Sequence, residues 1–146
     1  MSQPSRILVI DDNMLFAQTV QRMLTRKGVI AEAAFDGPTG MAMAWENAYD
    51  LVIVDLVMPK LDGFEIIRRL KEVPKGPRLI AMSGNVSVSG PISLEAAVAC
   101  GAHAVLEKPF TQDLLFERVF KTLAVVPRLP VPPRLDPSPT RARLFA

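Results

Sequence analysis

Short, uninterrupted apolar runs alternate along the chain with longer stretches in which apolar residues recur every three or four positions. The continuous runs are ILVI (7–10), LVIV (51–54), LIAM (79–82) and AVL (104–106), and VIAEAAF (29–35) is a weaker candidate. Apolar runs without polar alternation are typical of parallel strands that are covered on both faces. The pattern therefore predicts five strands.

Helical spacing appears in the segments between and after these runs. The apolar stripes are Phe16, Val20, Met23 and Leu24; Met41, Ala44, Trp45 and Ala48; Phe64, Ile66, Ile67 and Leu70; the segment 91–101; and Leu115, Phe116, Val119, Phe120 and Leu123. Stripes of this kind bury one face of a helix against the core. Five successive β-α units predict an α/β domain with a parallel sheet, right-handed crossovers and helices on both faces.

Composition and charge narrow the class of protein. The chain has 146 residues, 49% hydrophobic and 22% charged, which suits one soluble globular domain. Residues 1–125 carry a net charge of −1, so charge gives no argument for nucleic acid binding. The single cysteine, Cys100, excludes an internal disulfide. No secretory signal and no apolar span of membrane length is apparent, so we expect a cytoplasmic protein without a membrane contact.

The last 21 residues differ from the rest. Residues 126–146 hold six of the 13 prolines and a net charge of +3. Proline-rich sequence disfavours helix and favours extended chain. We therefore expect a domain over residues 1–125 and a Pro/Arg-rich C-terminal tail over 126–146, with no output domain. The tail is interpreted as a terminus or linker; the alternative is that its arginines and terminal LFA dock on a partner or a second copy.

Polar residues follow the apolar runs where ligands bind in open parallel sheets, beyond the carboxyl ends of the strands. They are Asp11 and Asp12 after the first run, Asp55 after the third, Ser83 and Gly84 after the fourth, and Glu107, Lys108 and Pro109 after the fifth. Clustered carboxylates repel one another unless a cation intervenes. Hard oxygen ligands without His or Cys select an ion such as Mg²⁺, and a metal beside a lysine suits phosphoryl oxygens.

Four motifs carry a resemblance to a known family. VIDDN, VDLVMPKLDG, AMSGN and LEKPF, in this order, resemble the receiver domain of response regulators in two-component signalling, of which CheY-like single-domain regulators are the small members. The resemblance covers roughly residues 5 to 125, and the four motifs together are specific. It implies a flavodoxin-like (βα)5 fold with strand order 2-1-3-4-5. It also implies a phosphorylation-controlled signalling module rather than an enzyme.

The resemblance implies a role for each acid. Asp55 would be the phospho-acceptor, taking a phosphoryl group from a sensor histidine kinase or a phosphotransfer protein. Asp12 and Asp55 would bind Mg²⁺ directly, Asp11 would act mostly through water, and the backbone carbonyl of Val57 would be the third protein ligand. The output would be a contact with a downstream protein.

The remaining site residues are also implied by the family. Ser83 and Lys108 would each hold a phosphoryl oxygen, and Gly84 would keep the entrance open. Pro109 would follow a cis peptide bond that aims Lys108. A homodimer through the 91–125 face, which carries Phe116 and Phe120, is a further expectation.

Some positions depart from the family pattern. Val105 stands where receivers often carry an aromatic switch residue, so the signal is either altered or carried by Ser83 and the adjoining loop. The loop over 84–91 is longer than usual, and it either orders on phosphorylation or is a tolerated insertion. Val57 and Asn85 predict slow loss of the phosphoryl group, because a valine side chain cannot orient water. His103 is interpreted as structural.

Three other functions fit the sequence less well than a phosphorylated receiver domain. A receiver-like interaction domain that does not use phosphate is disfavoured because the residues needed for the chemistry are present. A flavodoxin-like electron carrier would need a hydroxyl-rich loop where this chain has Asp11, Asp12 and Asn13. A phosphohydrolase of the haloacid dehalogenase type would need two acids spaced two apart after the first strand, which the chain lacks.

Overall fold

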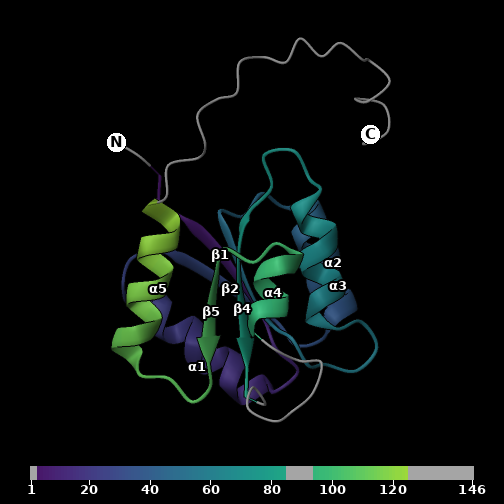
Figure 1. The fold of residues 1–146 in the computed structure, drawn as a ribbon. Helices are drawn as coiled ribbons and strands as arrows, with labels where there is room; N and C mark the ends of the chain where they lie inside the picture. Colours follow the sequence, from purple (N-terminus) through teal and green to yellow (C-terminus); the bar gives the residue numbers. More distant parts are fainter. Residues whose placement is uncertain (1–2, 85–93, 125–146) are drawn as a thin grey trace.

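Strands and helices alternate strictly along the chain in the computed structural model, which describes residues 3–84 and 94–124 (Figure 1). The strands are β1 (Arg6–Ile10), β2 (Ile30–Ala34), β3 (Leu51–Asp55), β4 (Arg78–Ser83) and β5 (Ala104–Glu107). The helices are α1 (Met14–Thr25), α2 (Gly37–Glu46), α3 (Gly63–Lys71), α4 (Leu94–Cys100) and α5 (Gln112–Ala124). The five β-α units predicted from the sequence are thus confirmed.

The strands form one parallel sheet in the order β2-β1-β3-β4-β5, as expected. Each face of the sheet has its own apolar core, since side chains of a strand alternate between faces. Leu8, Val52 and Leu79 pack on the face covered by α2, α3 and α4. Ile7, Ile53 and Ile80 pack on the other face against α1 and α5. Figure 1 shows these two helical layers with the sheet between them.

Four helices begin at a polar side chain that accepts a backbone hydrogen bond, and at α5 this is Thr111 Oγ1, which accepts from the N–H of Leu114 at 3.0 Å. Asn13 accepts from the N–H of Phe16, Asp36 from Thr39 and Asp62 from Glu65. Such caps satisfy N–H groups that have no partner within the helix. Asp36 and Asp62 thus serve as the N-caps of α2 and α3.

Helix α2 differs from its predicted apolar stripe. It ends at Glu46, so Ala48 lies beyond it, and the Trp45 side chain is 66% exposed rather than buried. The buried face is instead made by Gly37 and Gly40. A Cβ atom at Gly40 would lie 2.6 Å from Cδ1 of Ile10, so the helix approaches β1 more closely than any side chain would allow. Glycine carries no apolar signal. The predicted stripe is therefore correct for Met41 and Ala44, which pack against the core, and wrong for Trp45 and Ala48, which are exposed.

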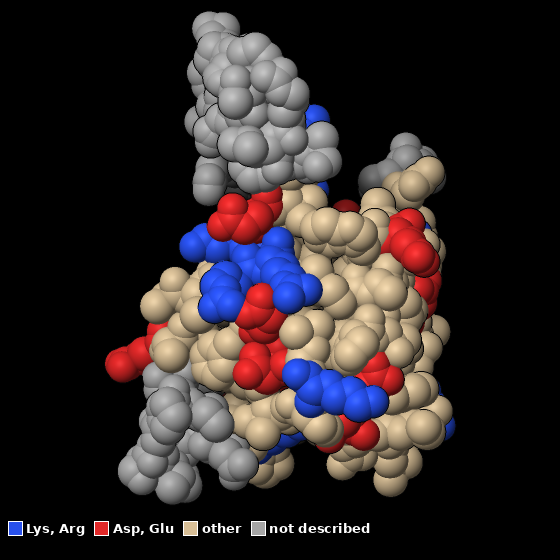
Figure 2. All heavy atoms as spheres, turned by 90° about the vertical axis from the view of Figure 1, so that its right-hand side faces the viewer, with Lys and Arg blue, Asp and Glu red and all other residues tan. Residues whose placement is uncertain are grey.

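Charge is unevenly distributed over the α2 and α3 side of the molecule. On helix α3, Glu65 forms ion pairs with Arg68 and Arg69. Helix α2, in contrast, has no charged residue before Glu46. Figure 2, which looks onto this side of the molecule, shows blue and red side chains gathered together beside a broad uncharged surface. Within the described part of the chain, no helix has both the length and the apolar content needed to cross a bilayer.

Candidate functional site

A lysine and two buried acids meet where three strands end. Asp11 directly follows β1, Asp55 is the last residue of β3, and Lys108 directly follows β5. The Lys108 Nζ atom lies 2.7 Å from Asp11 Oδ2 and 3.4 Å from Asp55 Oδ2. Asp11 is fully buried and Asp55 is 7% exposed. Residues far apart in the sequence are brought together because parallel strands end at the same edge of the sheet.

The backbone fixes the remaining oxygen of each acid. The N–H of Asn13 donates to Asp11 Oδ1 at 2.9 Å, and the N–H of Val57 donates to Asp55 Oδ1 at 3.3 Å. Asp12, which is exposed, completes a group of three carboxylates whose oxygens lie within 4.8 Å of one another. This donor set is purely oxygen, as Mg²⁺ and Ca²⁺ prefer. The residues present therefore fit a hard divalent cation.

The site holds more negative than positive charge, and the pKa of Asp55 is raised there. The pKa of Asp55 is raised from 3.8 to about 6, first by burial and then by the neighbouring Asp11 carboxylate, while Lys108 and the Val57 N–H oppose the rise. Both causes disfavour the charged form of a carboxyl group. A cation bound beside Asp55 would relieve this penalty.

The ring of Phe16, which packs against Phe110, lies beside the ammonium group of Lys108, and this contact was not predicted from the sequence. The Lys108 Nζ atom lies 4.4 Å from the ring centroid of Phe16, and Phe16 packs edge-on against Phe110 at 5.7 Å. The peptide bond between Lys108 and Pro109 is cis, as expected. Phe16 was assigned to the core by its helical spacing, and only the folded position of Lys108 gives it this contact.

Ser83 and the two glycines near it shape the wall of the site. Ser83 ends β4 and is fully buried, and its carbonyl accepts from the N–H of Lys108 at 2.9 Å. Among the residues that the structure describes, a Cβ atom at Gly84 would meet only the Lys108 side chain, at 3.8 Å. At Gly63, in contrast, a Cβ atom would lie 2.3 Å from the carbonyl oxygen of Asp55. Gly63 thus allows α3 to start directly against the end of β3.

The other residues that the sequence analysis considered do not all lie at the acids, since His103 bonds to Leu79 at the start of β4. Val57 has a 41% exposed side chain, and Val105 is partly buried with its carbonyl accepting from Arg118 Nε at 3.3 Å. His103 Nδ1 accepts from the N–H of Leu79 at 3.0 Å, which agrees with a structural role. Cys100 is partly buried against the core. Asn85, the rest of the 84–91 loop and the tail lie outside the described residues.

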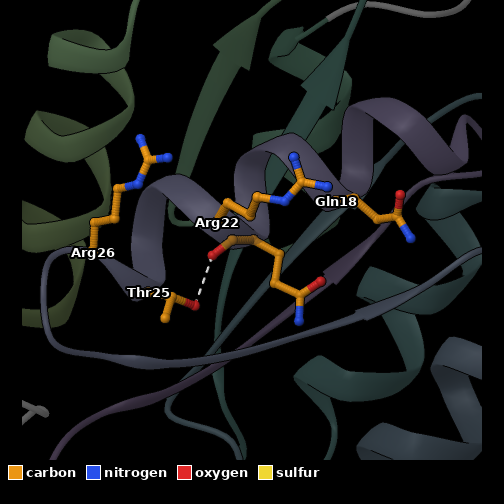
Figure 3. A pocket seen from close by; sticks show the side chains of 5 residues that line it. Gln18, Arg22, Thr25 and Arg26 are labelled. Carbon is orange, nitrogen blue, oxygen red and sulfur yellow. Dashed lines mark hydrogen bonds between the residues drawn. The ribbon is translucent and has the colours of Figure 1, made fainter.

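A hollow elsewhere on the surface contains none of the predicted site residues. It is shallow, about 390 Å³, and lies over the outer face of α1. Figure 3 shows that its lining side chains come from this helix, among them Gln18 and Arg22, and from Arg26 directly after it. The chemistry of the acids and Lys108 therefore lies outside this hollow.

Known proteins similar to this chain agree with the geometry. A family model described as the response regulator receiver domain matches residues 7–120. The response regulator MprA of Mycobacterium sp. (strain KMS) is 33% identical over 116 residues, which cover 80% of this chain and 49% of MprA. The response regulator PleD of Caulobacter vibrioides is 34% identical over 115 residues, 79% of this chain and 25% of PleD. The chain thus spans half the length or less of these curated relatives.

Solved structures give the same family. A response regulator receiver domain from Bermanella marisrubri is 33% identical with a TM-score of 0.73, covering 83% of this chain and 99% of that one. A response regulator from Burkholderia pseudomallei, solved with a phosphorylated aspartic acid, a calcium ion and citrate, is 27% identical with a TM-score of 0.70 over 83% of this chain and 67% of that one. Sheet order, strand-end acids and these matches lead to one conclusion: the chain belongs to the response regulator receiver domain family of two-component signalling.

Proposed function

We propose that Asp55 accepts a phosphoryl group from a phosphohistidine on a histidine kinase or phosphotransfer protein, and that the phosphorylated domain signals by binding another protein. The observation that carries the proposal is the contact of Lys108 with both Asp11 and Asp55 at the edge of the sheet. The phosphorylated aspartic acid of the similar Burkholderia protein supports it.

The transfer makes one bond and breaks one. A carboxylate oxygen of Asp55 attacks phosphorus as the P–N bond of the donor breaks, and the bonding electrons return to the imidazole nitrogen. The product is an acyl phosphate on Asp55 and a free histidine. The buried end of β3 holds the nucleophile in place, and the approach of two oriented groups lowers the barrier.

The residues around Asp55 would neutralise the negative charge of the incoming phosphoryl group. Lys108 lies close enough to pair with one of its oxygens, and Ser83 and Gly84 border the same space. Asp11, Asp12 and Asp55, with the carbonyl of Val57, would hold Mg²⁺. The ion, when bound, supplies positive charge to the transferring oxygens. Pro109 would keep Lys108 aimed at the site.

Exposed apolar side chains beside the acids offer a place for the phosphodonor to bind. Met14 and Leu15, at the start of α1, are 52% and 70% exposed and follow the acids directly in the sequence. Phe120 on α5 is 37% exposed and pairs with Phe116 at 6.3 Å, and it remains a candidate contact for a downstream protein or a homodimer.

The direct test is to locate the phosphoryl group. The protein is incubated with Mg²⁺ and a small acyl phosphate, and the added mass is assigned to a peptide. We expect the label on the peptide that contains Asp55 and no label in Asp55→Asn. The matched control is Asp113→Asn, an exposed acid at the start of α5. Unchanged labelling in Asp55→Asn would overturn the proposal.

The alternative function is an interaction domain that does not use phosphate. It would be favoured if the wild-type protein took no label and still bound its partner equally well. The full set of acids and the inward-facing Lys108 argue against it, because an unused cluster of buried charges costs stability.

A further inference from the structure

Besides the two acids, the ring of Phe16 contacts the ammonium group of Lys108. The Nζ atom lies over the ring at 4.4 Å from its centroid, and the nearest carboxylate oxygens of Asp11 and Asp55 are at 2.7 and 3.4 Å. A cation this close to an aromatic ring is attracted by the negative charge of its face. Unlike the acids, the ring has no oxygen that a metal ion or a phosphorus atom would bind. The contact with Phe16 can therefore persist while the ionic partners of Lys108 change.

Asn13 fixes the position of both Asp11 and Phe16. Its N–H donates to Asp11 Oδ1 at 2.9 Å, and its side-chain oxygen accepts from the N–H of Phe16 at 3.0 Å. Asn13 is also the N-cap of α1, so these bonds belong to the start of a helix that packs on the sheet. The first turn of α1 thus presents Lys108 with an acid and an aromatic face in a fixed arrangement.

The ring of Phe16 is also held by the segment that carries Lys108. Phe110, two residues further on, packs edge-on against Phe16, with ring centroids 5.7 Å apart and ring planes at 78°. Both rings are partly buried against the core that α1 and α5 cover. Aromatic pairs of this geometry stabilise each other beyond the apolar area that they bury. Phe16 is therefore held in place by contacts that do not involve the ammonium group.

The Lys108 side chain, in contrast, depends on its partners for its position. Its backbone is anchored, since its N–H donates to the carbonyl of Ser83 at 2.9 Å, but its flexible stem ends in a side chain that is 20% exposed. Lysine is among the side chains that lose most conformational entropy when they are ordered. When Asp55 takes up a phosphoryl group, its 3.4 Å contact with Lys108 gives way to a contact with a phosphoryl oxygen. During this exchange the ammonium group needs another partner.

We propose that Phe16 is a positioning residue for phosphoryl transfer, which keeps the Lys108 ammonium group at the site while its partner changes from the Asp55 carboxylate to a phosphoryl oxygen. The proposal rests on the function proposed for Asp55, and Phe16 itself forms and breaks no bond. The contact tolerates the movement, because the ammonium group can shift by about 1.5 Å from its present 4.4 Å and still lie within about 6 Å of the ring centroid. An aliphatic side chain at this position would not attract the ammonium group, which could then turn towards the solvent.

The test varies the charge on the face of the ring at nearly constant shape. Monofluorophenylalanine and trifluorophenylalanine are incorporated at position 16, because fluorine withdraws electrons from the ring and weakens its attraction for a cation. We expect the initial rate of labelling by the acyl phosphate, with Mg²⁺, to fall stepwise from the native ring to the trifluorinated one. Phe16→Leu should be about fivefold slower than the wild type, and Phe16→Tyr, which keeps an electron-rich face, should stay within about twofold of it.

Lys27 and Phe116 provide a matched control. The Lys27 Nζ atom lies over the ring of Phe116 at 4.8 Å, and Phe116 is partly buried against the same core as Phe16. This pair joins the segment after α1 to α5 and does not include the acids or Lys108. Phe116→Leu, and trifluorophenylalanine at position 116, should leave the labelling rate unchanged. A fall as large as that at position 16 would indicate a general loss of packing and would overturn the proposal.

A second measurement reports on the contact without a phosphodonor or a metal ion. Because an aromatic face shields nearby protons, the Cε protons of Lys108 should resonate upfield of those of the exposed Lys121. The difference should disappear in Phe16→Leu. Resonances of Lys108 and Lys121 at the same position in the wild type would overturn the proposal.

The labelling rates separate this role from the function on which it rests. If the trifluorinated protein were labelled as fast as the wild type, Phe16 would act through packing alone, and only the proposal for Phe16 would fall. If the wild type took no label on Asp55, the function proposed for Asp55 would fall, and the role of Phe16 in transfer with it.

Discussion

The ammonium group of Lys108 donates to the carboxylate of Asp11 at 2.7 Å, across 97 positions of sequence. Asp11 is fully buried, and 20% of the Lys108 side chain remains exposed. A buried carboxylate needs a partner, because it has lost the water that stabilised its charge. Lys108 therefore serves the fold of the domain before any phosphoryl group arrives.

Replacing Lys108 with alanine should destabilise the protein. The change leaves Asp11 without its cation and removes one of the groups that lower the pKa of Asp55. We expect a loss of about 1–3 kcal/mol in the free energy of unfolding at pH 7.5, less than for a fully buried pair because Lys108 is partly solvated. Urea unfolding measures it, with the exposed Lys121→Ala as control. Wild-type stability in Lys108→Ala would show that the pair contributes nothing.

The raised pKa of Asp55 predicts how stability depends on pH. A carboxyl group whose pKa rises from 3.8 to about 6 on folding binds a proton more tightly in the folded state, so stability falls as pH rises through that interval. The loss is at most about 3 kcal/mol for a shift of roughly two units. Asp55→Asn removes this loss.

The variant should therefore be more stable than the wild type at pH 7.5, and the difference should shrink at pH 4.5. Unfolding in urea at the two pH values, without divalent ions, checks this. A Glu117→Gln control on the exposed side of α5 should show no such pH-dependent gain. If Asp55→Asn were less stable than the wild type at pH 7.5, the repulsion between Asp55 and Asp11 would be too weak to matter.

Adding Mg²⁺ should stabilise the wild-type protein by neutralising the three acids. A ligand that binds only the folded state at ten times its Kd adds about 1.4 kcal/mol. The melting temperature should therefore rise with MgCl₂ and much less with NaCl at the same ionic strength. Asp12→Asn and Asp55→Asn should each reduce the rise, since each removes one oxygen ligand of the group. An equal rise in all three proteins would place the ion elsewhere.

The sequence was sufficient for the sheet and for most of the site. Apart from β2, each strand ends where an apolar run meets a polar residue, and the rule that the carboxyl ends of parallel strands converge predicts that Asp11, Asp55 and Lys108 meet. Helix starts such as those at Asp36 and Asp62 are local features, because capping depends on one side chain and its immediate neighbours.

What the sequence did not reveal depends on contacts between distant segments. Trp45 has the spacing of a core residue, yet the close approach of Gly40 to Ile10 centres the buried face of α2 on Gly37 and Gly40 and leaves the indole at its side exposed. The contact of Phe16 with Lys108 has no local signal either. Periodicity describes one element at a time, and it cannot say which of two faces meets the sheet.

Two glycines beside the acids provide a matched pair of substitutions. Neither Gly63 nor Gly84 is among the residues with positive φ, so alanine is acceptable to the backbone at both, and only the surroundings differ. Gly63→Ala would place a Cβ atom 2.3 Å from the Asp55 carbonyl oxygen and 2.7 Å from Cα of Leu56, and relief requires a backbone shift. Overpacking of this kind costs about 1–3 kcal/mol, more than the helix propensity that alanine adds. Gly84→Ala meets Lys108 at an ordinary 3.8 Å and should be nearly neutral.

Two measurements compare the variants: the free energy of unfolding in urea and the rate of labelling by the acyl phosphate. Both should fall for Gly63→Ala and stay at the wild-type value for Gly84→Ala, because only the first substitution displaces Asp55. Equal behaviour of the two variants would mean that the end of β3 is not held in place by the start of α3.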